Sequence, residues 1–195
     1  RLTALQDYAW DGYLFSQPDS AFYFAQILYD FAAAKDLKLY MSKALNLQGV
    51  SLANRSKYSE AITAYERSLA ISEELGNTRI STIVATNLGT VFFKLGNFSI
   101  AAEYFTIALT EYETIGDEVG TANQLTNLGS VQLGMNQYDK ALINYNKALE
   151  IYQNQKLKNK RLIAIAISNI GDANSKKGEL EAALGFYLES TTKAK

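Results

Sequence analysis

The sequence contains no cysteine and no histidine. Without cysteine, these residues form no disulfide, no thiolate metal site and no cysteine nucleophile. Without histidine, they lack the side chain most often used as a general base or metal ligand. Serines such as Ser81 have no histidine base, and the carboxylates Glu73, Glu74, Glu111 and Glu113 are expected on the surface near helix ends. We therefore predict no enzyme activity, no cofactor and no metal site.

An excess of either charge is also absent, because 19 basic residues face 20 acidic ones and the net charge is −1. A broad nucleic-acid-binding surface or a polybasic membrane anchor needs a basic excess. The apolar stretch at residues 21–28 is too short to span a bilayer, and no signal peptide is visible. We predict no nucleic-acid partner and no membrane insertion in this fragment, and leave a soluble cytoplasmic or bacterial periplasmic location open.

Proline is almost absent, since Pro18 is the only one, and this favours a chain that is nearly all helix. Apolar residues make up 48% of the 195 residues and charged residues 20%, as in ordinary folded proteins. The length suits one domain or one repeat array. Because the sequence starts at Arg1 and stops at Lys195 inside an expected helix, we expect it to be part of a longer protein.

An internal repeat is present four times. Asn-Leu-Gly starts at residues 87 and 127 and Asn-Ile-Gly at residue 169, and Gly49 marks an earlier copy. The same kinds of residue follow each glycine at fixed spacing, and each copy predicts two helices joined by a turn, as at residues 96–97, 136–137 and 177–178. The columns are large apolar (Tyr58, Phe98, Tyr138, Leu180), alanine (Ala61, Ala101, Ala141, Ala183), aromatic (Tyr65, Phe105, Tyr145, Tyr187) and small (Ser68, Ala108, Ala148, Ser190).

These columns resemble the tetratricopeptide repeat. The resemblance implies an all-α fold, a right-handed superhelix of about five helix pairs that serves as a scaffold for protein–protein interaction. The usual aromatic residue early in the first helix and the usual proline after the second are absent here. The period of 40 residues exceeds the usual value of about 34 and is similar to that of kinesin light chain, spindle-orientation adaptors and many bacterial regulators.

The period divides the chain into five parts. Residues 1–41 are predicted to be a degenerate first repeat with helices at 2–15 and 20–35, the second capped by Asp19 or Ser20. The remaining repeats are expected at residues 42–81, 82–121, 122–163 and 164–195. Trp10 and Tyr13 would cover the end of the stack or anchor a partner.

A second, less specific resemblance concerns residues 18–46. This stretch resembles the start of the repeat regions of bacterial signalling proteins, in which the repeats precede a nucleotide-cyclase or histidine-kinase output domain. The resemblance implies that the array is the sensory or regulatory part of a longer bacterial signalling protein.

The concave groove of such an array is lined by the first helix of each pair, and steps of four and three residues select the side chains that face it. Asn87, Asn127 and Asn169 occupy one column, where Leu47 stands in the second repeat. A row of amides could bind a peptide backbone, as in the similar asparagine ladder of O-GlcNAc transferase, or each amide could bond a neighbouring helix. The predicted peptide-binding residues are Asn87, Asn127, Asn169, Thr90, Lys94, Asn123, Ser130 and Asp172.

A basic run lies between the fourth and fifth repeats, at Lys156, Lys158, Lys160 and Arg161. We interpret it as a solvated loop, with a site for an acidic partner as the alternative.

The last predicted helix, residues 179–192, gives a second hypothesis for function. Leu180, Ala183, Leu184 and Tyr187 are expected to pack inward, yet no polar capping helix follows them. The array could therefore self-associate as a homodimer and control an attached output domain such as an adenylate or guanylate cyclase.

Overall fold

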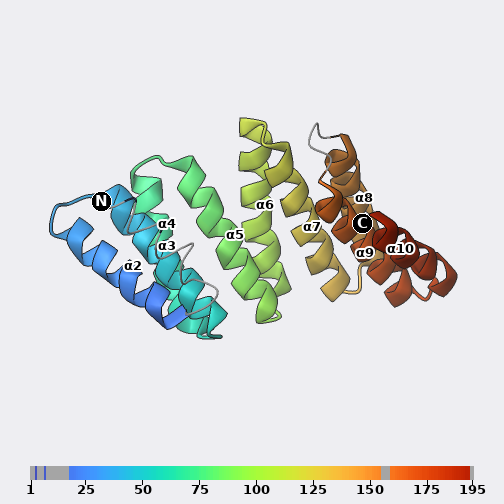
Figure 1. Cartoon of the computed structure of the whole chain (residues 1–195), viewed down its shortest axis with the longest axis horizontal. Coiled ribbons are helices and arrows are strands. Elements are labelled where there is room, and N and C mark those ends of the chain that lie inside the picture. The colour runs from blue at the N-terminus through green and yellow to red at the C-terminus, as the bar shows by residue number, and fades with distance from the viewer. Residues whose placement is uncertain (1–2, 4–6, 8–17, 155–158, 194–195) are drawn as a thin grey trace. The chain divides into compact units, whose positions relative to one another are not determined.

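The computed structural model describes residues 3, 7, 18–154 and 159–193. Residues 18–154 and 159–193 form nine α-helices and no β-strand (Figure 1), which confirms the predicted all-α fold. In chain order the helices are α2 (Pro18–Ala33), α3 (Lys38–Asn54), α4 (Tyr58–Glu74), α5 (Thr78–Lys94), α6 (Phe98–Ile115), α7 (Glu118–Gly134), α8 (Tyr138–Asn154), α9 (Lys160–Lys177) and α10 (Leu180–Lys193).

The helices alternate between two kinds of position. We call α3, α5, α7 and α9 the A helices and α4, α6, α8 and α10 the B helices, and α2 precedes them in a B position. Successive A helices start 40, 40 and 42 residues apart, which is the period found in the sequence. Each starts four residues before the predicted repeat boundary at 42, 82, 122 or 164.

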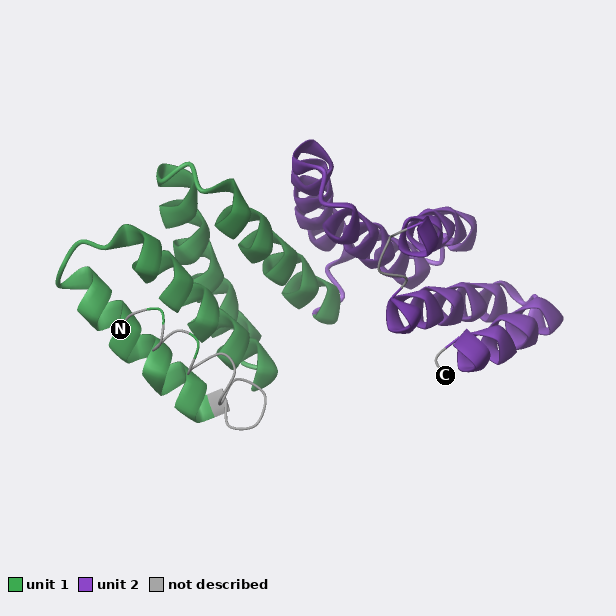
Figure 2. Ribbon diagram, turned by 45° about the horizontal axis from the view of Figure 1, so that its top comes forward, with its two compact units in different colours: residues 1–94 green, residues 95–195 purple. Residues whose placement is uncertain are grey.

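The chain divides into two compact units (Figure 2), residues 1–94 with α2–α5 and residues 95–195 with α6–α10. The division falls between α5 and α6, inside the predicted repeat 82–121. The single array expected from the sequence therefore stays a prediction.

Left-handed backbone conformations end the helices where the sequence predicts turns. Gly96, Asn136 and Gly178 have φ angles of 76°, 59° and 95°. After α7, the backbone N–H of Gln137 donates to the carbonyl of Gln132 at 2.8 Å, which satisfies a helix-end acceptor as in a Schellman turn. These turns confirm the predicted breaks at residues 96–97, 136–137 and 177–178.

The start of α2 differs from the prediction. The helix begins at Pro18 rather than at residue 20, because proline in a first turn lacks only an N–H that would be unpaired there anyway. Asp19 therefore lies within the first turn, and its carboxylate pairs with Arg55 at 2.8 Å. The other predicted helix of this repeat, residues 2–15, lies outside the described residues apart from positions 3 and 7.

In the first unit, small residues let the helices approach closely. Ala25 and Leu28 of α2 form a buried cluster with Ala44 and Leu47 of α3. Gly49 of α3 lies under the ring of Tyr65 of α4, where an added Cβ would be only 2.5 Å from Cε1. The glycine and aromatic columns of the sequence are therefore a single contact between the two helices of a pair.

The second unit repeats this contact and adds larger clusters. Gly129 of α7 lies under Tyr145 of α8, and Gly171 of α9 lies under Tyr187 of α10. The first buried cluster joins α7, α8 and α9, and the second joins α8 to α9. The first cluster consists of Ala122, Leu125, Ala148, Tyr152, Ile163, Ala166 and Ile167. The second cluster consists of Ala141, Tyr145, Ile170 and Ala173.

The packing of α10 corrects the prediction for this helix. Ala183 is buried, whereas Leu180 and Leu184 are 67% and 60% exposed, and Tyr187 is half-buried. One repeat earlier, Leu142 is half-buried because it packs against the cluster that joins α8 to α9, and Tyr138 is also half-buried. No described helix provides α10 with that cover for its two leucines.

Candidate functional site

In the first unit, Asn87 lies half-buried on α5 and bonds the preceding A helix. Its Nδ2 donates a hydrogen bond to Oδ1 of Asn46 on α3 at 2.9 Å. This is the neighbouring-helix contact that the sequence left open as the alternative to peptide binding. Because an amide has two N–H donors and an acceptor oxygen, this bond leaves one donor and the oxygen of Asn87 outside the pair.

Two further predicted residues share α5 with Asn87. Thr90 is exposed, and its hydroxyl donates to the carbonyl of Thr86 at 2.9 Å. Lys94 is the last residue of the helix and is exposed. The equivalent of Asn87 in the second repeat, Leu47, is only 2% exposed because it packs against α2. The prediction that this column faces a groove is therefore wrong for Leu47.

In the second unit, α7 carries Asn123, Asn127 and Ser130. The Nδ2 of Asn127 donates to Oε1 of Gln124 in the same helix at 3.2 Å. Oδ1 of Asn123 accepts from the hydroxyl of Tyr152 on α8 at 2.7 Å. The side chains of α7 that were predicted to bind peptide are thus held in place by hydrogen bonds within this unit.

On α9, Asn169 and Asp172 occupy the corresponding positions. Asp172 is exposed, and its Oδ1 accepts from the hydroxyl of Tyr187 on α10 at 2.7 Å. Asn169 is half-buried, and within the described residues its side chain makes no hydrogen bond. Of the three asparagines, Asn169 has the amide group with the most hydrogen-bonding capacity available to a ligand.

Tyrosines of the B helices orient this polar face, and sequence reasoning treated them only as core residues. The Tyr145 hydroxyl donates to Oγ of Ser130 at 3.1 Å, and Tyr187 makes the equivalent bond to Asp172. In both cases the tyrosine lies 15 residues after its partner. A polar residue after the repeat glycine, combined with tyrosine in the aromatic column, is a signal that could have predicted these bonds.

The ionisation of these tyrosines supports their role as donors. Burial raises the pKa of Tyr145, and its hydrogen bond with Ser130 offsets this only in part. The hydrogen bond to Asp172 is the main cause of the raised pKa of Tyr187, and burial adds to it. Both hydroxyls therefore remain protonated at neutral pH and can donate to the side chains of the A helices.

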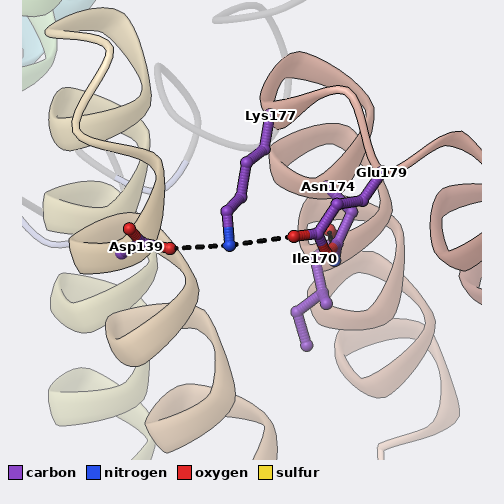
Figure 3. A network of polar contacts seen from close by, with 5 residues as sticks. All are labelled: Asp139, Ile170, Asn174, Lys177 and Glu179. Carbon is purple, nitrogen blue, oxygen red and sulfur yellow. Dashed lines mark hydrogen bonds and ion pairs between the residues drawn. The ribbon is translucent and has the colours of Figure 1, made fainter.

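An ion pair links consecutive helix pairs at two equivalent places. In the second unit, Nζ of Lys177 lies 2.9 Å from both Asp139 and Glu179 (Figure 3). In the first unit, Arg55 pairs with Asp19 in the same way. In each case a carboxylate at the second position of a B helix binds a cation at the end of the next A helix.

We expect Lys177→Met to lower the urea midpoint of the chain at low salt, because both carboxylates lose their cation. The difference should disappear in about 1 M NaCl, where the Debye length is about 3 Å and an exposed pair is screened. Asp139 and Glu179 raise the pKa of Lys177 above its ordinary 10.5, so the effect should be present at neutral pH and fade on the alkaline side only as the pH passes that value.

Lys176→Met is the matched control, since Lys176 is the exposed neighbour and makes no ion pair within the described part of the chain. An equal loss in both variants, or a loss unchanged by salt, would contradict a role for this ion pair.

Some predicted features lie elsewhere or beyond the described residues. Lys160 and Arg161 belong to the first turn of α9 rather than to a loop, because Asn159 caps the helix by accepting from the N–H groups of residues 161 and 162. Lys156 and Lys158 lie outside the described residues, as do Trp10 and Tyr13.

The described part of the chain shows neither a metal site nor a membrane-spanning helix. No group of three or more metal-ligating side chains there could hold a metal ion. No helix there has the length and apolar character needed to cross a membrane.

The chain matches the family model described as tetratricopeptide repeat over residues 40–114, 81–154 and 120–195, well over half of its length. None of the curated proteins matches it significantly.

Solved structures match almost the whole chain. BtubC (BKLC) from P. vanneervenii has a TM-score of 0.74 and 21% identity, covering 98% of this chain and 78% of BtubC. MamA from Desulfovibrio magneticus RS-1 has a TM-score of 0.70 and 15% identity over 98% of this chain and 94% of its own. The TPR-like repeats described as a kinesin light chain from Podosopora anserina have a TM-score of 0.76 and 12% identity, covering 98% of this chain and 92% of that chain. At such identities, the similarity shows the fold alone.

Proposed function

Because the chain belongs to the tetratricopeptide repeat family, whose members bind protein partners, we propose that it is a non-catalytic scaffold that binds an extended segment of another protein. In each of the two units, the proposed binding surface is the polar face of the A helices, which we call the helix-A face of that unit. In the second unit this face carries Asn123, Asn127 and Ser130 of α7 and Asn169 and Asp172 of α9. In the first unit it carries Asn87, Thr90 and Lys94 of α5.

The recurrence of asparagine at one position of α5, α7 and α9 carries the proposal. An asparagine amide can accept from a peptide N–H and donate to a peptide carbonyl at once, whatever the side chains of the ligand are. Most of the other polar groups on the face are uncharged, so contacts to the main chain would dominate. Preorganisation by Tyr145 and Tyr187 would lower the entropy cost of binding.

Replacing Asn87, Asn127 and Asn169 together with alanine is the direct test. The probes are 12-residue peptides selected on the unmodified chain from a random display library, with affinities measured by fluorescence anisotropy. A peptide bound to the second unit loses two of these amides, each making hydrogen bonds of about 0.5–1.5 kcal/mol, and its binding should weaken by at least about fivefold. Far-UV circular dichroism should show unchanged helicity.

The control is Asn146→Ala, which removes an exposed asparagine of α8 whose Nδ2 donates to the carbonyl of Leu142 in the same helix. It should leave the affinity of the same peptides unchanged. If the triple variant binds them as tightly as the unmodified chain does, the asparagine column is not the peptide-binding site.

Two finer parts of the proposal are supported by the sequence alone. The first is that the scaffold is the regulatory part of a bacterial signalling protein. The second is the alternative function, a homodimer that controls an attached output domain. Light scattering coupled to size exclusion separates that alternative from peptide binding. A chain that is monomeric at high concentration would exclude the homodimer and would not affect the proposal that the helix-A face binds peptide.

A further inference from the structure

The helix-A face of each unit has an asparagine that lies between two cations. An arginine lies eight residues before the asparagine and a lysine lies seven residues after it, on the same side of the helix. At the rise of an α-helix, the two cations are about 12 Å and about 10 Å from the asparagine along the axis. The three residues are Arg79, Asn87 and Lys94 on α5, and Arg161, Asn169 and Lys176 on α9.

These four cations are available to a ligand. All four are exposed, and none of them forms an ion pair within the described residues. Helix stability does not explain the two arginines, because Arg79 and Arg161 lie in the first turns of α5 and α9. The helix dipole favours a negative charge in a first turn and opposes a positive one.

The exposure of this face on α9 does not result from the end of the sequence. The preceding A helix, α7, is followed by both α9 and α10. At the positions of Arg161 and Lys176, α7 has Val119 and Gly134, and both are exposed. The face therefore stays open when a further helix pair follows.

The A and B helices differ in charge, although the net charge of the whole sequence is only −1. In the first unit, α3 and α5 contain four basic residues and no acidic one, whereas α2 and α4 contain six acidic residues and one basic one. In the second unit, α7 and α9 contain four basic and two acidic residues, whereas α6, α8 and α10 contain seven acidic and three basic ones. Because like charges repel, the B helices of each unit disfavour an acidic ligand and the A helices attract it.

We propose that the helix-A face of each unit binds an acidic segment of the partner protein, an inference that rests on the function proposed above. The extended main chain of this segment crosses α5 at Asn87 or α9 at Asn169. Its alternate side chains point in opposite directions, toward the arginine and toward the lysine of the same helix. Aspartate or glutamate side chains on both sides of the segment then pair with the two cations.

One acidic residue, Asp172, lies on the same face of α9. Its carboxylate accepts a hydrogen bond from the hydroxyl of Tyr187 at 2.7 Å, which reduces its repulsion of an acidic ligand. On α5 the equivalent residue is Thr90, so this face of α5 carries no negative charge.

A protein segment fits the face better than a nucleic acid does. An isoleucine lies between the arginine and the asparagine of each helix, Ile83 on α5 and Ile165 on α9, and these are 37% and 43% exposed. They offer a contact to an aliphatic side chain, which nucleic acids lack. Two flanking cations on one helix are also few for a nucleic-acid backbone, whose binding releases counterions from many phosphates.

Peptide selection on the unmodified chain is the first test. The 12-residue peptides that a random display library yields should carry a net negative charge, and their affinity should fall as salt is added. Two double variants then remove one pair of cations each, Arg79→Gln with Lys94→Gln and Arg161→Gln with Lys176→Gln. At low salt, each acidic peptide should bind about threefold to tenfold more weakly to at least one of them, and this loss should disappear in about 1 M NaCl.

Lys140→Gln with Lys147→Gln is the matched control, because it removes the same charge from α8, a B helix. Both lysines are exposed and make no ion pair within the described part of the chain. This variant should leave the affinity unchanged, and circular dichroism should show that all three double variants stay folded.

Two results would overturn this inference: selected peptides without a net negative charge, or equal losses in the control and in the two cation variants. If such peptides still lost affinity when Asn87, Asn127 and Asn169 are replaced, the function proposed above would stand without it. A complete absence of peptide binding would overturn both. An oligothymidylate whose binding depended on the same four cations would instead identify a nucleic acid as the occupant.

Discussion

Tyr145→Ala is expected to lower the free energy of unfolding of the second unit by about 3–5 kcal/mol, the usual loss when a large buried aromatic is truncated. Tyr145 is 1% exposed and packs with Ala141, Ile170 and Ala173 between α8 and α9. Those neighbours belong to two rigid helices, so they cannot close the cavity. The measurement is urea unfolding followed by far-UV circular dichroism, with amide hydrogen exchange locating the loss in α7, α8 and α9.

Tyr145→Phe separates the packing of the ring from its hydroxyl. It removes only the hydrogen bond to Ser130, which contributes about 0.5–1.5 kcal/mol. Phe105 stands at the equivalent position of the third repeat and is 2% exposed, so the column accepts phenylalanine. If the phenylalanine variant lost as much stability as the alanine variant, the hydroxyl rather than the ring would dominate this contact.

Gly129→Ala is expected to lower the free energy of unfolding by about 1–3 kcal/mol, because the added methyl overpacks the contact between α7 and α8. A Cβ at this position would be 2.6 Å from Cε1 of Tyr145, closer than carbon atoms can pack. The ring is 1% exposed and packs with Ala141, Ile170 and Ala173, so moving it would disturb these contacts. The clash therefore outweighs the gain of about 1 kcal/mol that alanine brings to a helix interior.

Gly185→Ala is the matched control for this prediction. Gly185 lies in α10, and a Cβ there would have no neighbour within 4 Å. Only the helix propensity remains, so this variant should be neutral or more stable by up to about 1 kcal/mol. The same urea experiment measures both variants. If Gly129→Ala stabilised the chain as Gly185→Ala does, the close approach of α7 and α8 would be contradicted.

Combining the two substitutions tests whether they share one contact. In the Tyr145→Ala background the added methyl of Gly129→Ala no longer meets a ring and fills part of the cavity. The two losses should therefore be less than additive, with a coupling of about 0.5–3 kcal/mol. Full additivity would mean that Gly129 and Tyr145 contribute to stability independently.

The sequence was sufficient to predict the helices and turns, but it did not predict the hydrogen-bond partners of most polar side chains. The glycine and aromatic columns predicted two helices per repeat and the turn residues between them, because each repeated spacing reports one helix face. The asparagine column also followed from spacing. Its hydrogen bonds did not: Asn87 reaches Asn46, 41 positions earlier, whereas Asn127 bonds within its own helix. Equal positions in a repeat have different neighbours, so their partners differ.

The errors have the same origin. Leu180 and Leu184 have the spacing of core residues, yet they are exposed because burial depends on a neighbouring helix and not on the helix itself. Leu47 shares the column of the asparagines, yet it is buried because α2 packs against it. Local spacing states which residues share a face of a helix, but it does not state what covers that face.

The sequence by itself therefore determined the helical class, the repeat period, the turns and the family of this protein, since these depend on local periodicity and backbone conformation. Only the tertiary structure decided which polar side chains are held by tyrosine hydroxyls, which carboxylates link consecutive helix pairs and which leucines remain uncovered. These features depend on contacts between helices far apart in the chain, where rotamers and helix packing decide which atoms meet.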